Sequence, residues 1–154
     1  MFKNYFTLFE IEPVFDINFG DIEKKYIELI KIDINERQSK NMKNINKAYH
    51  TLKSPLKRAE YLLYILGIEI QKDCSNFEVE VLDESIKIRE FLLECDDLQF
   101  ASRMINGKIE NCINNLIDAF GAKNFSKAVM QVVRLRYLYK SLEEIKKNAT
   151  NTDF

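Results

Sequence analysis

Residue types that support chemistry are scarce in this chain of 154 residues, which has one His, three Cys and four Gly. With so few ligands, spaced so widely, a His/Cys zinc site within one chain is excluded, and no C-x-x-C pair or glycine-rich phosphate loop occurs. A nucleophilic Cys paired with His50 is a formal alternative, although no local signature supports it. The composition therefore favours a protein that has neither a catalytic site nor a cofactor of its own.

The overall charge narrows the range of partners. With 23 basic and 24 acidic residues, the formal net charge is −1, so the chain lacks the net basic field that drives non-specific nucleic-acid binding. No apolar run approaches the roughly 20 residues that span a membrane, and the N-terminus is too polar for a signal peptide. We therefore expect a cytoplasmic protein without a nucleic-acid or membrane partner.

Charge is nevertheless distributed unevenly along the chain. Residues 37–58 include seven basic residues and no acid, whereas residues 78–97 include eight acids and two basic residues. Such runs usually form solvated faces. The alternative is a pair of docking surfaces of opposite sign for different partners, and the basic run keeps nucleic-acid binding open as a further alternative.

Apolar residues recur at helical spacing through almost the whole sequence. The stripe at Ile22, Tyr26 and Leu29 predicts a helix that Asn18 or Asp16 caps. Ser54-Pro55 has the pattern of an N-cap followed by Pro at the first helical position, which predicts a helix, a break and a second helix over 40–66. Gly67 is expected to end the second of these helices.

Three long helical patterns follow a polar stretch and complete the expected fold. They run over 78–95, 98–120 and 125–147, and Gly121 is expected to close the second of them. Short loops between long helices favour antiparallel neighbours. The predicted fold class is all-α, and its expected parts are an N-terminal helical domain at 1–70, a linker at 71–77 and a C-terminal three-helix bundle at 78–154.

Two stretches carry a recognisable family pattern. The first is Tyr5-Phe6-Thr7-Leu8-Phe9, and the second runs from Ile45-Asn46-Lys47-Ala48-Tyr49 to Pro55-Leu56-Lys57-Arg58-Ala59-Glu60-Tyr61-Leu62-Leu63. Together they resemble the HscB family, the J-domain co-chaperones of iron–sulfur cluster assembly that are called Jac-type in mitochondria. The resemblance covers essentially the whole chain, most strongly its first part, and implies that the N-terminal domain is J-domain-like.

The resemblance implies an adaptor with two protein partners and no catalytic site. In the family, the J-domain docks on a DnaK/HscA-type chaperone and stimulates its ATP hydrolysis, while the C-terminal bundle binds an IscU-type scaffold protein and delivers it. The basic face that J-domains present on their second helix falls on Lys24, Lys25 and Lys31. Solvation and i,i+4 ion pairing are the alternative interpretation of these lysines.

One departure from the family pattern concerns the His-Pro-Asp tripeptide that J-domains use to trigger ATP hydrolysis. Alignment without a gap places this tripeptide on Ile34-Asn35-Glu36, so only a negative charge is kept. Asn35 cannot stiffen the chain as Pro does, and Ile34 offers no hydrogen bond in place of an imidazole. The interpretations are a weakened co-chaperone, a co-chaperone whose partner chaperone has co-adapted, or an adaptor that binds the scaffold and no longer stimulates ATP hydrolysis.

The resemblance also assigns a scaffold-binding face on the acidic helix. Ile88-Arg89-Glu90 resembles a Leu-Arg-Glu motif of the family, and Val132-Val133-Arg134-Leu135-Arg136-Tyr137-Leu138 resembles its Val-Arg-Lys-Leu-Arg-aromatic-Leu pattern. These anchors place the scaffold-binding positions on Leu82, Asp83, Ile86, Lys87, Glu90, Glu94 and Tyr137. The alternative is that the apolar members belong to the bundle core, while Arg134 and Arg136 pair with the acids of this helix.

A function of another class, an all-α bundle enzyme, is the remaining alternative. It would need a cavity that is lined by convergent charged groups. A bundle filled with side chains would remove this alternative.

Overall fold

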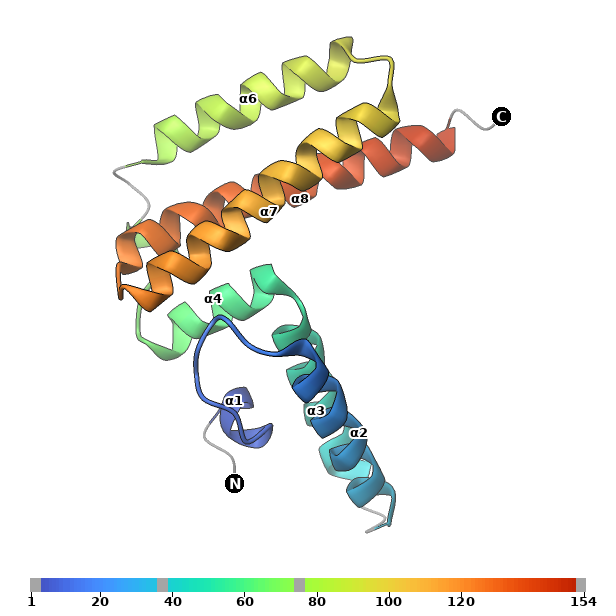
Figure 1. Ribbon diagram of the computed structural model, residues 1–154, viewed down its shortest axis with the longest axis vertical. Helices are drawn as coiled ribbons and strands as arrows, with labels where there is room; N and C mark the ends of the chain where they lie inside the picture. Colours follow the sequence, from blue (N-terminus) through green and yellow to red (C-terminus); the bar gives the residue numbers. More distant parts are fainter. Residues whose placement is uncertain (1–3, 36–38, 74–76, 152–154) are drawn as a thin grey trace. The chain divides into compact units, whose positions relative to one another are not determined.

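The computed structural model describes residues 4–35, 39–73 and 77–151, which form helices joined by short segments, with no strand among them. The prediction of an all-α fold is confirmed. The chain divides into two compact units, Met1–Gly67 and Ile68–Phe154, which we call the N-terminal unit and the C-terminal unit. Figure 1 shows the helices in chain order.

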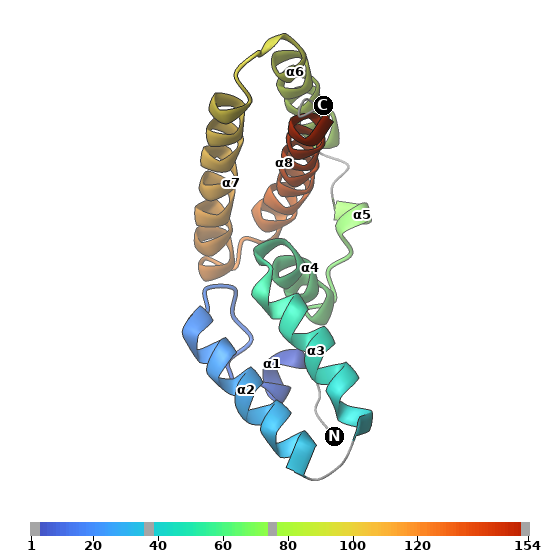
Figure 2. The ribbon, with the colours of Figure 1, turned by 90° about the vertical axis from the view of Figure 1, so that its right-hand side faces the viewer.

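The N-terminal unit contains four helices around an aromatic and aliphatic core. They are α1 (Tyr5–Leu8), α2 (Phe19–Asn35), α3 (Ser39–Lys53) and α4 (Pro55–Ile65). α2 and α3 lie side by side and antiparallel, as Figures 1 and 2 show. The core side chains are Phe6, Phe9, Phe15, Ile22, Ile45, Ala48, Leu52, Ala59, Leu62 and Leu63.

The ends of these helices follow the predicted capping residues. The Asp21 N–H donates to Asn18 Oδ1 at 3.3 Å, so Asn18 caps α2. Ser54 Oγ accepts from the Lys57 N–H, and Pro55 opens α4, which confirms the predicted break. Gly67 follows the last turn of α4 with φ +77°, a left-handed conformation that glycine adopts without steric cost.

A buried arginine joins three segments of the N-terminal unit. Arg58 on α4 donates from Nε to the Phe15 carbonyl and from Nη1 to the Leu52 carbonyl, each at 2.8 Å. Its guanidinium carbon lies 4.7 Å from the centre of the Phe15 ring. The Arg58 side chain therefore satisfies two backbone acceptors that water does not reach.

The C-terminal unit is a three-helix arrangement preceded by one short helix. Its members are α5 (Ile70–Asp73), α6 (Glu78–Glu94), α7 (Leu98–Gly121) and α8 (Phe125–Asn151). α7 and α8 pack closely as an antiparallel pair, and α6 packs against α8. Helix starts and ends lie within a few residues of the predicted ones. The main core side chains are Val81, Ile105, Cys112, Leu116, Val129, Val132, Leu135 and Leu138.

Two local features differ from the sequence expectations. α5 lies partly within the expected linker 71–77 and packs against α8, so this segment begins the C-terminal unit. A helix of four residues is one turn, which is too short to give a periodic apolar pattern.

The turn between α7 and α8 is the second difference. α7 runs through Gly121, and the left-handed residue that ends it is Lys123, with φ +57°. The N–H groups of Lys123 and Asn124 donate to Phe120 and Ala119 carbonyls, which is a Schellman arrangement. Lys123 therefore occupies the position that glycine usually takes.

Candidate functional site

The exposed face of α2 presents the residues that were predicted to meet a chaperone. Lys24 and Lys31 are seven residues apart, so they lie two turns apart on one face, and both are exposed. Ile27 and Ile34 are also exposed and lie beside these lysines at helical spacing. The face therefore combines positive charge with apolar surface, which suits a protein partner.

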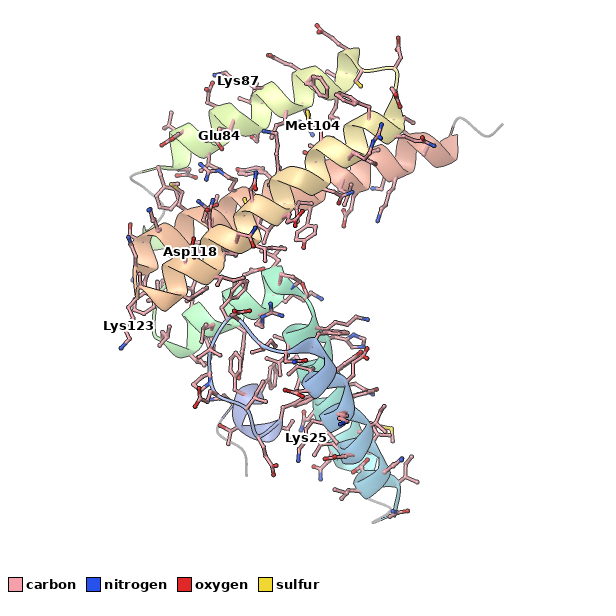
Figure 3. The ribbon with its side chains drawn as sticks, in the orientation of Figure 1. Lys25, Glu84, Lys87, Met104, Asp118 and Lys123 are labelled. Carbon is pink, nitrogen blue, oxygen red and sulfur yellow. The ribbon has the colours of Figure 1, made fainter. Side chains whose placement is uncertain are left out.

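Lys25 is engaged within the N-terminal unit. Its Nζ lies 2.8 Å from Glu10 Oε2 and 3.7 Å from Glu28 Oε2. The hydrogen bond to Glu10 raises the pKa of Lys25, with further support from both carboxylate charges. Lys25, labelled in Figure 3, thus ties α2 to the segment that follows α1. Its charge is less available to a partner than those of Lys24 and Lys31.

The first two residues that align with His-Pro-Asp continue the helix. Ile34 and Asn35 are the last two residues of α2, and both are exposed. Neither residue blocks helical backbone, whereas a Pro at position 35 would lack the N–H that the helix uses there. Glu36 lies outside the described residues. The sequence comparison implied a position just after the helix, and the structure instead places the first two members inside its last turn.

Asp33, in the last turn of α2, is an unusual member of this region. Its exposed fraction is 4%, and in the described part of the chain neither carboxylate oxygen has a hydrogen-bond partner. A buried polar group without a partner carries a desolvation cost. The negative end of the helix dipole also disfavours an ionised carboxylate at this position.

We therefore expect Asp33→Leu to raise the free energy of unfolding of the N-terminal unit by about 1–3 kcal/mol, because an apolar side chain removes the desolvation cost. Chemical denaturation followed by circular dichroism measures the change. Asp21→Leu is the matched control, since Asp21 is exposed in the first turn of α2, where the dipole favours an acid. A loss of stability in Asp33→Leu would contradict the unpartnered burial of this carboxylate.

On the C-terminal unit, three predicted scaffold-binding residues come together. Leu82 and Ile86 of α6 and Tyr137 of α8 line a groove of about 140 Å³ between these helices. Leu82 is 45% exposed and Ile86 is 48% exposed, so neither belongs to the bundle core. The core alternative for these two residues is therefore wrong, and the groove is an accessible apolar surface.

The remaining predicted positions lie beside this groove on the outer side of α6. Lys87 Nζ lies 3.0 Å from Asp83 Oδ2, so these two charges neutralise each other. This ion pair raises the pKa of Lys87, chiefly through the hydrogen bond from Lys87 to Asp83. Glu90 and Glu94 are exposed one turn apart. The outer side of α6 is therefore acidic at its C-terminal half.

Two arginine–glutamate bridges hold α6 to α8. Arg134 donates from Nε and Nη2 to the two carboxylate oxygens of Glu84, at 2.7 and 2.9 Å. Burial opposes the charge of Arg134, but the hydrogen bonds and charge of Glu84 outweigh it, so the pKa of Arg134 is raised. Arg89 contacts Glu144 at 2.8 Å. The prediction that Arg134 pairs with the acidic helix is confirmed.

A larger groove of about 680 Å³ opens between α6 and α7 and is bordered by α8. Its wall includes Ile88 and Met104, the latter labelled in Figure 3 together with Glu84 and Lys87. Burial raises the pKa of Cys112, which also lines the groove, to about 11. The thiol therefore stays protonated at neutral pH and is not an activated nucleophile. Because side chains do not fill this groove, packing does not remove the bundle-enzyme alternative.

The sequence interpretation missed two exposed apolar residues on α6. Val79 is 80% exposed and Leu93 is 82% exposed. They lie seven residues before and seven residues after Ile86, so all three share one side of the helix. That spacing around Ile86 is the signal that would have identified them.

The residues that the structure describes include neither a metal-binding cluster nor a membrane-spanning helix. Within those residues, no group of three or more His, Cys, Asp or Glu side chains is placed to hold a metal ion. None of the described helices is long and apolar enough to cross a membrane.

Comparison with known proteins places these surfaces in a family context. A family model described as the HSCB C-terminal oligomerisation domain matches residues 78–146. A co-chaperone protein HscB homolog of Neisseria meningitidis is 32% identical, over 93% of this chain and 97% of its own. An Arabidopsis thaliana iron–sulfur cluster co-chaperone protein HscB homolog is 26% identical, over 94% of this chain and 63% of its own. The crystal structure of human co-chaperone protein HscB superposes with a TM-score of 0.84 at 26% identity, over 96% of this chain and 82% of that one.

Proposed function

Because the chain belongs to the HscB family of co-chaperones, we propose that it binds an IscU-type iron–sulfur scaffold and delivers it to a DnaK/HscA-type chaperone, whose ATPase it stimulates. The observation that carries this proposal is a pair of exposed faces of opposite charge, one on each unit. In this proposal the protein acts in the cytoplasm as an adaptor, without a catalytic site, a cofactor, or a nucleic-acid or membrane partner.

The α6–α8 groove supports the scaffold half of the proposal. Leu82, Ile86 and Tyr137 provide apolar surface on a side that remains open to solvent. Glu90 and Glu94 lie beside it and would select a partner that has basic groups next to its apolar surface. The two bridges from α8 fix α6 in place, so that little ordering is required when a partner docks.

The α2 face supports the chaperone half. Lys24 and Lys31 would attract an acidic chaperone surface, and Ile27 would add apolar contact. The helical Ile34 and Asn35 favour the second candidate function, a J-like adaptor that binds the scaffold but no longer stimulates ATP hydrolysis. Ile34 lacks the imidazole of the usual tripeptide, and Asn35 lacks the fixed φ angle that Pro provides.

A steady-state ATPase assay of the cognate DnaK-type chaperone, with and without the cognate IscU-type scaffold, separates these functions. Synergistic stimulation by the full chain supports the co-chaperone. Scaffold binding in calorimetry without stimulation supports the adaptor. If the protein neither stimulates the chaperone ATPase nor binds the scaffold, both proposed functions are contradicted.

Restoring the tripeptide tests the trigger directly. If positions 34–36 are the only defect, the combined change Ile34→His, Asn35→Pro and Glu36→Asp should raise ATPase stimulation, because a Pro at position 35 ends α2 before the restored acid. The same assay measures it. The single change Glu36→Asp is the control, since it keeps the charge and leaves Ile34 and Asn35 unchanged. No gain in the triple variant would point to a co-adapted chaperone.

A further inference from the structure

The apolar surface of α6 extends well beyond the α6–α8 groove. Val79, Ile86 and Leu93 follow each other at intervals of seven residues, and Leu82 lies between the first two on the same side. We call these four residues the α6 stripe. Fourteen residues of helix separate its ends, which corresponds to about 21 Å at 1.5 Å per residue. The two end residues are more exposed than the two in the middle.

The two sides of the α6 stripe differ in charge. Along one side Lys87 pairs with Asp83 and also interacts with the charge of Glu90, and with Glu94 this side keeps a net negative charge among the predicted binding positions. On the other side, Arg89 is engaged with Glu144 of α8. A partner that covers the α6 stripe therefore meets apolar surface with most of the negative charge along the edge that carries Glu90 and Glu94.

We propose that Val79 and Leu93 are the outer anchors of the scaffold-binding face, so that the scaffold presents an apolar ridge about 20 Å long with basic groups along one edge. This inference rests on the proposed function and adds to its binding surface Val79, which lies about one turn beyond Leu82, and Leu93, which lies between Glu90 and Glu94. The ridge length makes the two anchors specificity-determining, because a scaffold with a shorter ridge leaves one of them in water.

The negative charge of Glu90 and Glu94 favours the scaffold as the occupant over a second copy of this chain. A second α6 stripe would bring another Glu90 and Glu94 and would not supply the basic edge that these acids select. Side chains that start four-fifths exposed gain most from being covered, since the benefit scales with the apolar area removed from water.

Calorimetry of the full chain with its purified cognate IscU-type scaffold tests the inference. We expect Val79→Ser and Leu93→Ser each to weaken binding about tenfold, and the double variant to lose more, with unchanged helicity in circular dichroism. Tyr64→Ser is the matched control, because Tyr64 is 76% exposed but lies on α4 of the N-terminal unit. Its affinity should equal that of the wild type.

Three outcomes would overturn the inference, and they are distinguishable. If Ile86→Asp weakens binding and the double variant does not, the outer anchors are wrong while the proposed function stands. If the double variant abolishes self-association in sedimentation equilibrium and keeps its scaffold affinity, the α6 stripe binds a second copy. If the wild type does not bind the scaffold at all, the proposed function fails together with the inference.

Discussion

Ile86→Asp should weaken scaffold binding by about 30-fold or more, the loss that is typical when a central interface residue is disrupted. Ile86 lies at the middle of the apolar surface and shares the α6–α8 groove with Tyr137. An aspartate there would carry its charge into a contact from which water is excluded, and it would add to the nearby acids. Isothermal titration calorimetry with the scaffold measures the change.

The matched control is Ile27→Asp on the exposed face of α2. Both isoleucines are about half exposed, so neither substitution removes core packing. We expect Ile27→Asp to reduce stimulation of the chaperone ATPase and to keep scaffold affinity, whereas Ile86→Asp should do the reverse. The assignment of separate faces would be wrong if either variant lost both activities while remaining folded.

Arg58→Met should lower the free energy of unfolding of the N-terminal unit by about 3 kcal/mol, because it leaves two buried carbonyl groups without donors. Those acceptors belong to Phe15 and Leu52, and the guanidinium that serves them also covers the Phe15 ring. Methionine fills much of the same volume but donates no hydrogen bond. Hydrogen exchange of the α3 and α4 amides reports this loss for the N-terminal unit alone.

Lys57→Met provides the control for Arg58→Met. Lys57 is the preceding residue on α4, and its side chain is exposed, so the same chemical change there should alter stability only slightly. Equal losses in both variants would show that the buried hydrogen bonds of Arg58 contribute little. A loss confined to Arg58→Met would assign the effect to the buried guanidinium, which serves the two carbonyls and covers the Phe15 ring.

Most of the fold could be predicted because its signals are local. Asn18, Ser54-Pro55 and the apolar stripes mark where helices begin and which side they bury, and the structure agrees with them. α5 and the left-handed Lys123 were not predicted. A single turn has no period, and lysine is not a residue type that marks a left-handed position.

The candidate sites were only partly predictable, because the contacts between side chains on different helices depend on the fold. Helical spacing places Leu82 and Ile86 on one side of α6, but it does not reveal that Tyr137 lies opposite them. The ion pair of Lys25 with Glu10 spans fifteen residues and follows no helical rule. The burial of Asp33 did have a signal, since it lies four residues after Leu29 and so continues the stripe of Ile22, Tyr26 and Leu29.

The way α6 is attached to its unit has an evolutionary consequence. α7 and α8 form the tightly packed pair, whereas α6 is joined to α8 through one buried edge and two arginine–glutamate bridges. Substitutions on the outward side of α6 are therefore nearly neutral for folding, and selection on that side comes chiefly from whatever docks there. The outer residues of α6 can therefore coevolve with a partner, whereas substitutions in the α7–α8 pair remain limited by its packing.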